Sequence, residues 1–323
     1  MNPKYPSPYK HAAFSQQYTP EFMLKLFALA DRMRESPQDF RKALDGKIVA
    51  LLFYKESTRT RMSFCSAVSR LGGVCLETEQ AEAFSSAAKG EKLSHTIRVV
   101  SGYADAIVLR HDDDNAHKEA LRAIATLRGP EVTFINAGCG SEQHPTQGLA
   151  DVYTLKRHFG TTENLHATVV GDLARGRACR SFMYSLSWWS TNRFSGVSPH
   201  NLRARDDIKN HLRERGCVYT EHEHLEEVMM QTNVIYMTRV QKERPLGGPQ
   251  WKLESELPYC LTRADADRLH PNTIIMHPLP NAGEIAGDVD GAPNEHYFRQ
   301  SDNGMWIRMA LLYTLLSNPD EKH

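Results

Sequence analysis

The stretch Ser57-Thr58-Arg59-Thr60 offers the strongest chemical signal in the chain. It stands between an apolar run that ends at Phe53 and a segment whose apolar residues recur at helical spacing. A helix that begins here presents unpaired backbone N–H groups and the positive end of its dipole to an anion. An arginine beside them can donate two parallel hydrogen bonds to a phosphoryl group. The pattern predicts a phosphate clamp; the alternative is an ordinary serine or threonine helix cap with exposed arginines.

Polar side chains also follow other apolar runs of the first half. Arg110 directly follows one such run, and His144 and Gln147 lie just before an amphipathic segment. Open α/β sheets bind ligands beyond the carboxyl ends of their strands. We therefore expect Ser57, Arg59, Arg110, His144 and Gln147 to converge on one crevice.

The stretch of small residues 81–91 has no core-forming period and contains one cation, Lys89, before the next helical segment. Such a stretch is a candidate mobile loop that closes on a site. The alternative is a solvated surface loop whose lysine has no function.

The second half excludes two nucleotide sites. Residues 171–178 nearly match a P-loop, but Arg177 and Ala178 stand where Lys and then Ser or Thr are needed. No Gly-x-Gly-x-x-Gly follows a predicted strand, which weighs against a dinucleotide. The acidic and histidine residues at 221–224 lack a further ligand cluster, so we interpret them as solvated charges and expect no metal. The polar segment 191–205 is expected to be a long connection.

The elements that position these residues alternate between short apolar runs and amphipathic helical segments. This rhythm predicts an α/β fold with two doubly wound parallel-sheet domains, because it restarts near Ala167 after a first series. A length of 323 residues also favours two domains. The segment from Asp302 to Leu315 is predicted to be a C-terminal helix.

Composition narrows the class of partner. The 39 basic and 39 acidic residues balance, so neither nucleic acid nor an anionic membrane is expected as a partner. No run approaches the ~18 apolar residues of a membrane span, and no secretory leader is recognisable at the start. A cytoplasmic location is therefore expected. The six cysteines are scattered singly and are interpreted as buried thiols rather than disulfides or zinc ligands.

The core Ser57-Thr58-Arg59-Thr60-Arg61 resembles the carbamoyl-phosphate signature of the aspartate and ornithine carbamoyltransferases, and further matches extend to the C-terminus. The resemblance implies that the C-terminal helix returns to the first domain. The expected domains are then 1–148 plus 303–323, which binds carbamoyl phosphate, and 149–302, which binds the acceptor. It also implies a homotrimer with active sites shared between subunits, and it leaves open whether regulatory chains bind.

The resemblance assigns roles residue by residue. Groups around the phosphate are matched by Ser57, Thr58, Arg59, Thr60 and Arg110. The carbamoyl group is matched by His144, Gln147 and the backbone carbonyl of Leu279. The acceptor's carboxylates are matched by Arg177, Arg239 and Gln241. Lys89 matches a loop lysine that reaches into a neighbouring subunit's site, where it would contact the acceptor as well.

The implied reaction is carbamoyl transfer to L-aspartate, which gives N-carbamoyl-L-aspartate and phosphate on the way to pyrimidines. Negative charge grows on the carbonyl oxygen as the amine attacks, so donors aimed there lower the barrier. The catalytic candidates are Arg59 and His144 at that oxygen and Lys89 at the departing phosphate. No covalent intermediate, cofactor or metal is needed. We identify no protein base for the amine, and the departing phosphate can serve.

The assignment of the acceptor depends on residues that differ between branches of the family. Pro278 stands where ornithine-type relatives usually have cysteine, which favours aspartate. Asn281, Ala178 and Ala88 depart from the family's usual residues, and Asn281 replaces an arginine that follows His-Pro-Leu-Pro. The alternatives are another amino acid or amine as acceptor, and a catalytically silent subunit that keeps the fold.

Overall fold

The chain divides into two compact units, Met1–Tyr153 with Asp302–His323, and Thr154–Ser301. The computed structural model describes residues 5–79, 90–127, 131–240 and 259–317. Both unit boundaries fall inside helices, α6 (Pro145–Phe159) and α10 (Tyr297–Leu316). Each unit is built on one sheet, as the alternating pattern predicts.

The first unit holds a four-stranded parallel sheet in the order β2-β1-β3-β4. Its strands are β1 (Ile48–Phe53), β2 (Val74–Glu79), β3 (Ala106–His111) and β4 (Thr133–Cys139). β1 lies in the middle and is buried after its first residue, as expected for an apolar strand covered on both faces.

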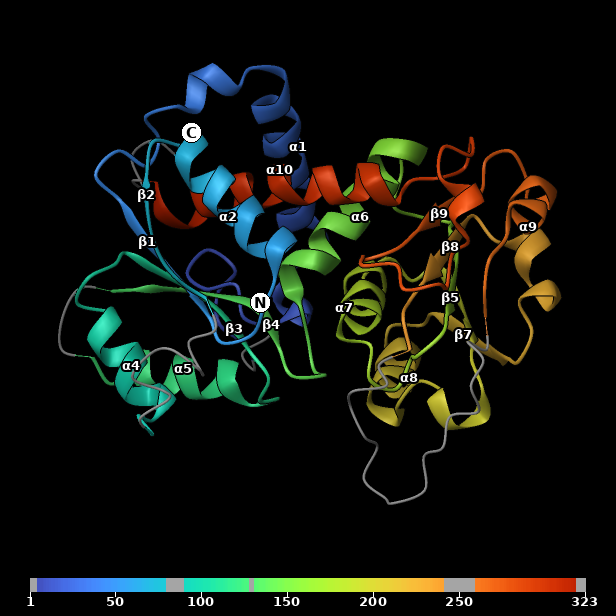
Figure 1. The fold of residues 1–323 in the computed structure, drawn as a ribbon, viewed down its shortest axis with the longest axis horizontal. Helices are drawn as coiled ribbons and strands as arrows, with labels where there is room; N and C mark the ends of the chain where they lie inside the picture. Colours follow the sequence, from blue (N-terminus) through green and yellow to red (C-terminus); the bar gives the residue numbers. More distant parts are fainter. Residues whose placement is uncertain (1–4, 80–89, 128–130, 241–258, 318–323) are drawn as a thin grey trace. The chain divides into compact units, whose positions relative to one another are not determined.

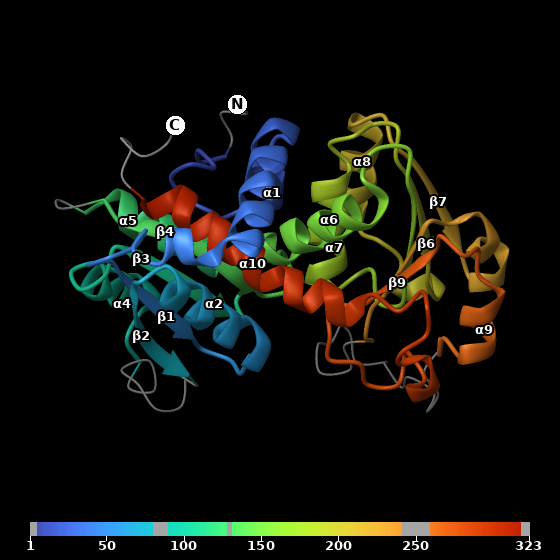
Figure 2. The ribbon, with the colours of Figure 1, turned by 90° about the horizontal axis from the view of Figure 1, so that it is seen from above.

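Helices cover both faces of this sheet. Figure 1 shows α4 (Leu93–Val100) and α5 (Ala116–Ala125) on one face, and α1 (Pro20–Glu35), α2 (Thr58–Arg70) and α10 on the other. Alternate residues of the strands, such as Leu52 and Leu109, join a core cluster with α4 and α5. α2 and α10 lie side by side in both views (Figures 1 and 2).

The second unit holds a five-stranded parallel sheet in the order β7-β6-β5-β8-β9. Its strands are β5 (His166–Val170), β6 (Arg193–Val197), β7 (Val218–His222), β8 (Val234–Met237) and β9 (Ile274–Met276). Its helices are α7 (Arg177–Leu186), α8 (Asp206–Glu214) and α9 (Arg263–Arg268). On one face, Phe182 of α7 stacks on Tyr236 of β8 with ring centroids 4.7 Å apart.

The predicted α/β class with two parallel sheets and a C-terminal helix is confirmed. The expectation of a long connection at 191–205 is wrong, because β6 begins at Arg193. This strand is short and contains Gly196. A Cβ at this position would lie 2.3 Å from the Tyr219 hydroxyl oxygen. Small and polar residues thus replace the apolar run that usually marks a buried strand. Among the described residues, no helix is long and apolar enough to cross a membrane.

Candidate active site

The predicted clamp lies where β1 leads into α2. α2 begins at Thr58, and Ser57 occupies the cap position but makes no side-chain capping bond. No acidic residue lies in the first turn, so the positive end of the helix dipole is not offset locally. Thr58 and Arg59 are exposed residues. The guanidinium end of Arg59 is nevertheless partly buried, which lowers the pKa of Arg59. The cap alternative loses its main support, since the serine hydroxyl does not cap the helix.

His144 lies beside the clamp, at the start of α6. Its Nε2 is 3.5 Å from Thr60 Oγ1, and its Nδ1 is 3.4 Å from Thr146 Oγ1. His144 is buried, with 5% of its surface exposed. The Gln147 amide donates to Asp151 Oδ1 at 2.8 Å. The structure thus brings the histidine and the predicted clamp together within the first unit.

Arg110 lies at an irregularity of the same sheet edge. The pairing of β3 with β4 shifts register between Leu109 and His111, and such bulges re-aim a side chain. Arg110 stands opposite Phe53 in the ladder, and its carbonyl accepts a hydrogen bond from the Tyr54 N–H at 3.0 Å. It is therefore next to the strand end that carries the clamp.

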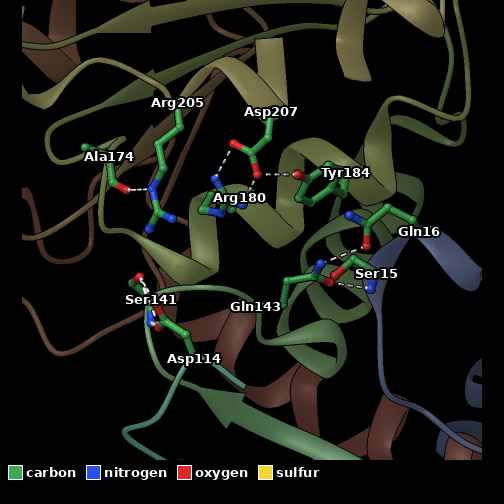
Figure 3. A network of polar contacts seen from close by, with 10 residues as sticks. All are labelled: Ser15, Gln16, Asp114, Ser141, Gln143, Ala174, Arg180, Tyr184, Arg205 and Asp207. Atoms are coloured by element: carbon green, nitrogen blue, oxygen red, sulfur yellow. Dashed lines mark hydrogen bonds and ion pairs between the residues drawn. The ribbon is translucent and has the colours of Figure 1, made fainter. Parts of the chain in front are cut away.

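The turn before His144 is anchored to the N-terminal segment. Gln143 Oε1 accepts a hydrogen bond from the Ser15 N–H at 2.7 Å, and Gln143 Nε2 donates to Gln16 Oε1 at 2.8 Å (Figure 3). In the same turn, Ser141 N–H donates to Asp114 Oδ1 at 2.6 Å. Sequence reasoning missed these supports, because glutamine and serine residues in loops carry no distinctive spacing.

In the second unit, Arg177 and Arg239 follow neighbouring strands. Arg177 is the first residue of α7, and Arg239 lies just beyond β8, which pairs with β5. Gly171 has φ +115°, and a Cβ there would come within 2.2 Å of the Thr238 carbonyl oxygen. The turn before Arg177 therefore packs directly on the backbone before Arg239.

Partly buried polar contacts support that turn. Arg205 Nε donates to the Ala174 carbonyl at 2.6 Å, and Arg180 holds both carboxylate oxygens of Asp207 (Figure 3). Burial alone would raise the pKa of Asp207, but the hydrogen bonds and charge of Arg180 outweigh it and hold the pKa at about 2. Tyr184 donates a further bond to Asp207 at 3.2 Å. Arg205 falls in the segment to which the sequence assigns no role.

Leu279 lies in a turn after β9 that is held by its own side chains. Its N–H donates to His277 Nδ1 at 2.7 Å, so the ring proton lies on Nε2, which faces Glu284 Oε1 at 2.7 Å. Asn281 Oδ1 accepts from the N–H groups of Gly283 and Ile285, each at 3.1 Å. Asn281 Nδ2 donates to the Ile285 carbonyl at 2.6 Å. The residue that departs from the family's arginine therefore stabilises the turn.

Two predicted site residues, Lys89 and Gln241, lie outside the described residues, as does the candidate loop as far as Lys89. The other candidates fall into two sets. The first unit holds Ser57, Thr58, Arg59, Thr60, Arg110, His144 and Gln147; the second holds Arg177, Arg239 and Leu279.

The described residues contain one group with the spacing of metal ligands, formed by Cys65, Cys75 and Glu77. Glu77 already accepts a hydrogen bond from Cys65 at 3.1 Å and forms an ion pair with Arg61 at 2.9 Å. We therefore assign no metal to this group. The interpretation of all six cysteines as buried thiols is wrong. Cys65 and Cys75 are half-buried and Cys260 is exposed.

Two family models match successive parts of the chain. The aspartate/ornithine carbamoyltransferase carbamoyl-P binding domain matches residues 10–157. The Asp/Orn binding domain of the same family matches residues 163–315. Together they span both units.

Named relatives match nearly the whole chain. The chloroplastic aspartate carbamoyltransferase of Oryza sativa subsp. japonica is 44% identical over 309 residues, which cover 94% of this chain and 84% of that protein. The aspartate carbamoyltransferase catalytic subunit of Clostridium novyi (strain NT) is 39% identical and covers 93% of this chain and 95% of that protein.

The prediction of a cytoplasmic location is wrong, because the similar rice protein is named as a chloroplastic enzyme. The prediction was based on the lack of a recognisable secretory leader and of a membrane span. Neither feature distinguishes the cytosol from the interior of an organelle.

A solved structure supports the same family. The aspartate transcarbamoylase of Trypanosoma cruzi, in complex with carbamoyl phosphate and aspartate, superposes with a TM-score of 0.85 at 31% identity, covering 95% of this chain and 96% of that chain. Because two models of one family span the chain and its relatives match it almost from end to end, the protein belongs to the aspartate/ornithine carbamoyltransferase family.

Proposed function

We propose that this protein is an aspartate carbamoyltransferase, which transfers the carbamoyl group of carbamoyl phosphate to L-aspartate and releases N-carbamoyl-L-aspartate and phosphate. This reaction serves pyrimidine biosynthesis. The observation that carries the proposal is the clamp at the start of α2 with buried His144 beside Thr60. The rice and Clostridium relatives bear the name of this enzyme.

The clamp binds the donor. Ser57, Thr58, Arg59, Thr60 and Arg110 surround the phosphate with hydroxyls, guanidinium groups and the N-terminal N–H groups of α2. Desolvation of a cation strengthens its attraction for a dianion, which fits the partial burial of Arg59. Gln147 and the Leu279 carbonyl contact the carbamoyl amide.

Catalysis acts on the charge that develops in the transition state. Arg59 and His144 donate to the carbonyl oxygen as the amine of aspartate attacks the carbamoyl carbon. Lys89 neutralises the phosphate as the C–O bond to it breaks. The departing phosphate takes the proton that the amine loses.

The acceptor is held by cations that follow neighbouring strands of the second unit. Arg177 and Arg239 pair with the two carboxylates, with Gln241 and Lys89 as further contacts. An arginine fork matches a carboxylate with two parallel hydrogen bonds. We assign carbamoyl phosphate to residues 1–148 with 303–323, and the acceptor to 149–302. The order of the two family models supports a donor part followed by an acceptor part, and the grouping of Asp302–His323 with the first unit supports the return of the C-terminal segment.

A homotrimer with shared sites completes the proposal, with Lys89 reaching the site of a neighbouring subunit. The test mixes Lys89→Ala protein with His144→Ala protein and allows subunits to exchange. Activity should return in mixed trimers, because some sites then receive both native residues. Verified mixed trimers with no activity would contradict sharing. The Clostridium relative is named a catalytic subunit, which supports an association of such trimers with separate regulatory chains.

The deciding experiment measures phosphate release from carbamoyl phosphate, with L-aspartate, L-ornithine and a panel of other amines in parallel, and identifies the product by mass. Aspartate-dependent release of carbamoyl aspartate is expected. Release with another amine alone would retain the donor half of the site and replace the acceptor. Binding of carbamoyl phosphate with no turnover on any acceptor would make the chain a silent subunit.

A further inference from the structure

Arg308, on the C-terminal helix α10, is a buried cation behind the phosphate clamp. It is 4% exposed, and its guanidinium lies 5.3 Å from the ring centroid of Phe64 on α2. Burial is the largest cause that lowers the pKa of Arg308, to about 10, so the group stays charged at neutral pH. Burying a charge is unfavourable unless it is compensated, so this position calls for an explanation.

One contact of Arg308 leads to the clamp. Arg308 Nη1 donates to Ser63 Oγ at 2.9 Å, and Ser63 Oγ in turn donates to the carbonyl of Thr60 at 2.8 Å. Thr60 is the clamp residue whose hydroxyl lies next to His144. The chain of bonds therefore runs from the C-terminal helix to the first turn of α2.

An electrostatic interaction links Arg308 to α6. The fully buried Asp151 carboxylate is close enough to raise the pKa of Arg308 and thus partly compensates its charge. The same carboxylate accepts the amide of Gln147. The positive charge of Arg110 has the opposite effect and lowers the pKa of Arg308. Two cations close together in a buried region favour a dianion near both.

The helix leaves room for this guanidinium. A Cβ at Gly304, one turn before Arg308, would come within 2.7 Å of Arg308 Nη1. Glycine inside a helix is less favourable than alanine, so its presence here has a packing reason.

We propose that Arg308 is a positioning residue for carbamoyl phosphate: it fixes Thr60 through Ser63 and Gln147 through Asp151, and it adds positive charge behind the bound phosphate. The inference rests on the proposed function. It assigns to α10 a part in donor binding that its place at the end of the chain does not suggest.

The first test compares Arg308→Met, Arg308→Lys and Ser63→Ala in phosphate-release kinetics and in calorimetric binding of carbamoyl phosphate. Arg308→Met should weaken carbamoyl-phosphate binding by about tenfold or more, the scale of a lost hydrogen bond to a charged group. The KM for aspartate should change less than about twofold. Arg308→Lys should recover part of the binding because it keeps the charge, and Ser63→Ala should show a smaller loss of the same kind.

Gly304→Ala displaces the guanidinium without removing it and should reproduce the loss of carbamoyl-phosphate affinity. Thr314→Ala, which removes a bond within the same helix, is the matched control and should leave affinity unchanged. If the folded Arg308→Met, Ser63→Ala and Gly304→Ala variants all bind carbamoyl phosphate like the wild type, Arg308 is only structural and the inference is wrong. A wild-type chain that binds no carbamoyl phosphate would instead refute the proposed function.

Discussion

The two units build their parts of the candidate site in different ways. In the first unit, side chains from α2, from α10 and from His144 just before α6 contact one another, as in the series Thr60, Ser63 and Arg308. In the second unit, the turn after β5 packs through Gly171 on the backbone before Arg239, and the turn around Leu279 is held by hydrogen bonds to side chains of the same turn.

This difference suggests different responses to substitution. Side chains on helix starts can be truncated while the helix remains, so changes in the first unit should alter chemistry more than folding. A turn depends on its backbone dihedrals and on close approach, so changes in the second unit should alter stability and acceptor binding together. Four predictions follow this contrast from the largest effect to the smallest.

Arg59→Ala should lower kcat by about 10²–10³, the usual result of removing a donor at developing negative charge. The free energy of unfolding should change by less than about 0.5 kcal/mol, because the residue is exposed. Steady-state phosphate release and thermal unfolding test both expectations. Arg70→Ala, at the other end of α2, is the control and should affect neither. A large loss of stability in Arg59→Ala would restore the structural interpretation of this arginine.

Gly171→Ala should destabilise the second unit by about 2–3 kcal/mol, because it adds backbone strain and a clash with the Thr238 carbonyl. Gly160→Ala separates the two causes, since Gly160 also has positive φ, +71°, but no atom within 4 Å of a Cβ. Chemical unfolding followed by aspartate titration measures the effect. Equal losses in both variants would show that the close approach to Thr238 contributes nothing.

Asn281→Ala should cost about 1–2 kcal/mol of stability and raise the KM for aspartate, because the turn around Leu279 loses its side-chain hydrogen bonds. Asn281→Asp keeps the oxygen that accepts from Gly283 and Ile285 and loses the donor to the Ile285 carbonyl, so its effect should be smaller. If Asn281→Ala instead changed acceptor choice without any loss of stability, the side chain would act on the acceptor directly.

Glu284 gives the smallest effect, on the pH dependence of stability. Burial is the largest single influence and would raise its pKa, but the interactions with His277 and with backbone N–H groups together outweigh burial and lower the pKa from 4.5. A carboxyl whose pKa is depressed by folding adds stability above its unfolded pKa and loses it as pH falls through the folded value. The wild type should therefore exceed Glu284→Gln in stability at pH 6, and the difference should shrink below about pH 4.5. A constant difference across this range would contradict the stabilising hydrogen bond between His277 and Glu284.

The sequence alone was sufficient for the number of sheets and for the strand–helix junction that carries the predicted clamp. Apolar runs followed by polar groups are local signals, and the strand end at Phe53 and the helix start at Thr58 lie where those signals place them. The sequence did not predict β6, because this strand is buried by the neighbouring elements and its own composition is not apolar throughout.

Asn281 shows how a single position can be misjudged from residue type. Its departure from arginine raised doubt about the acceptor, yet its amide forms three hydrogen bonds within its own turn. The roles of Asp207 and Gln143 were equally hidden, since their partners lie 27 and 127 residues away in the chain.

The sequence by itself determined the alternation of strands and helices, because this depends on residue types and short spacings, and its resemblance to a known family supplied the predicted donor and acceptor residues. Only the tertiary structure decided which side chains support the site. Arg308 and Ser63 are 245 residues apart, and no local pattern indicates that the last helix packs behind the first turn of α2. Their contact exists because the C-terminal helix is part of the first unit, where burial makes each hydrogen bond to the guanidinium matter.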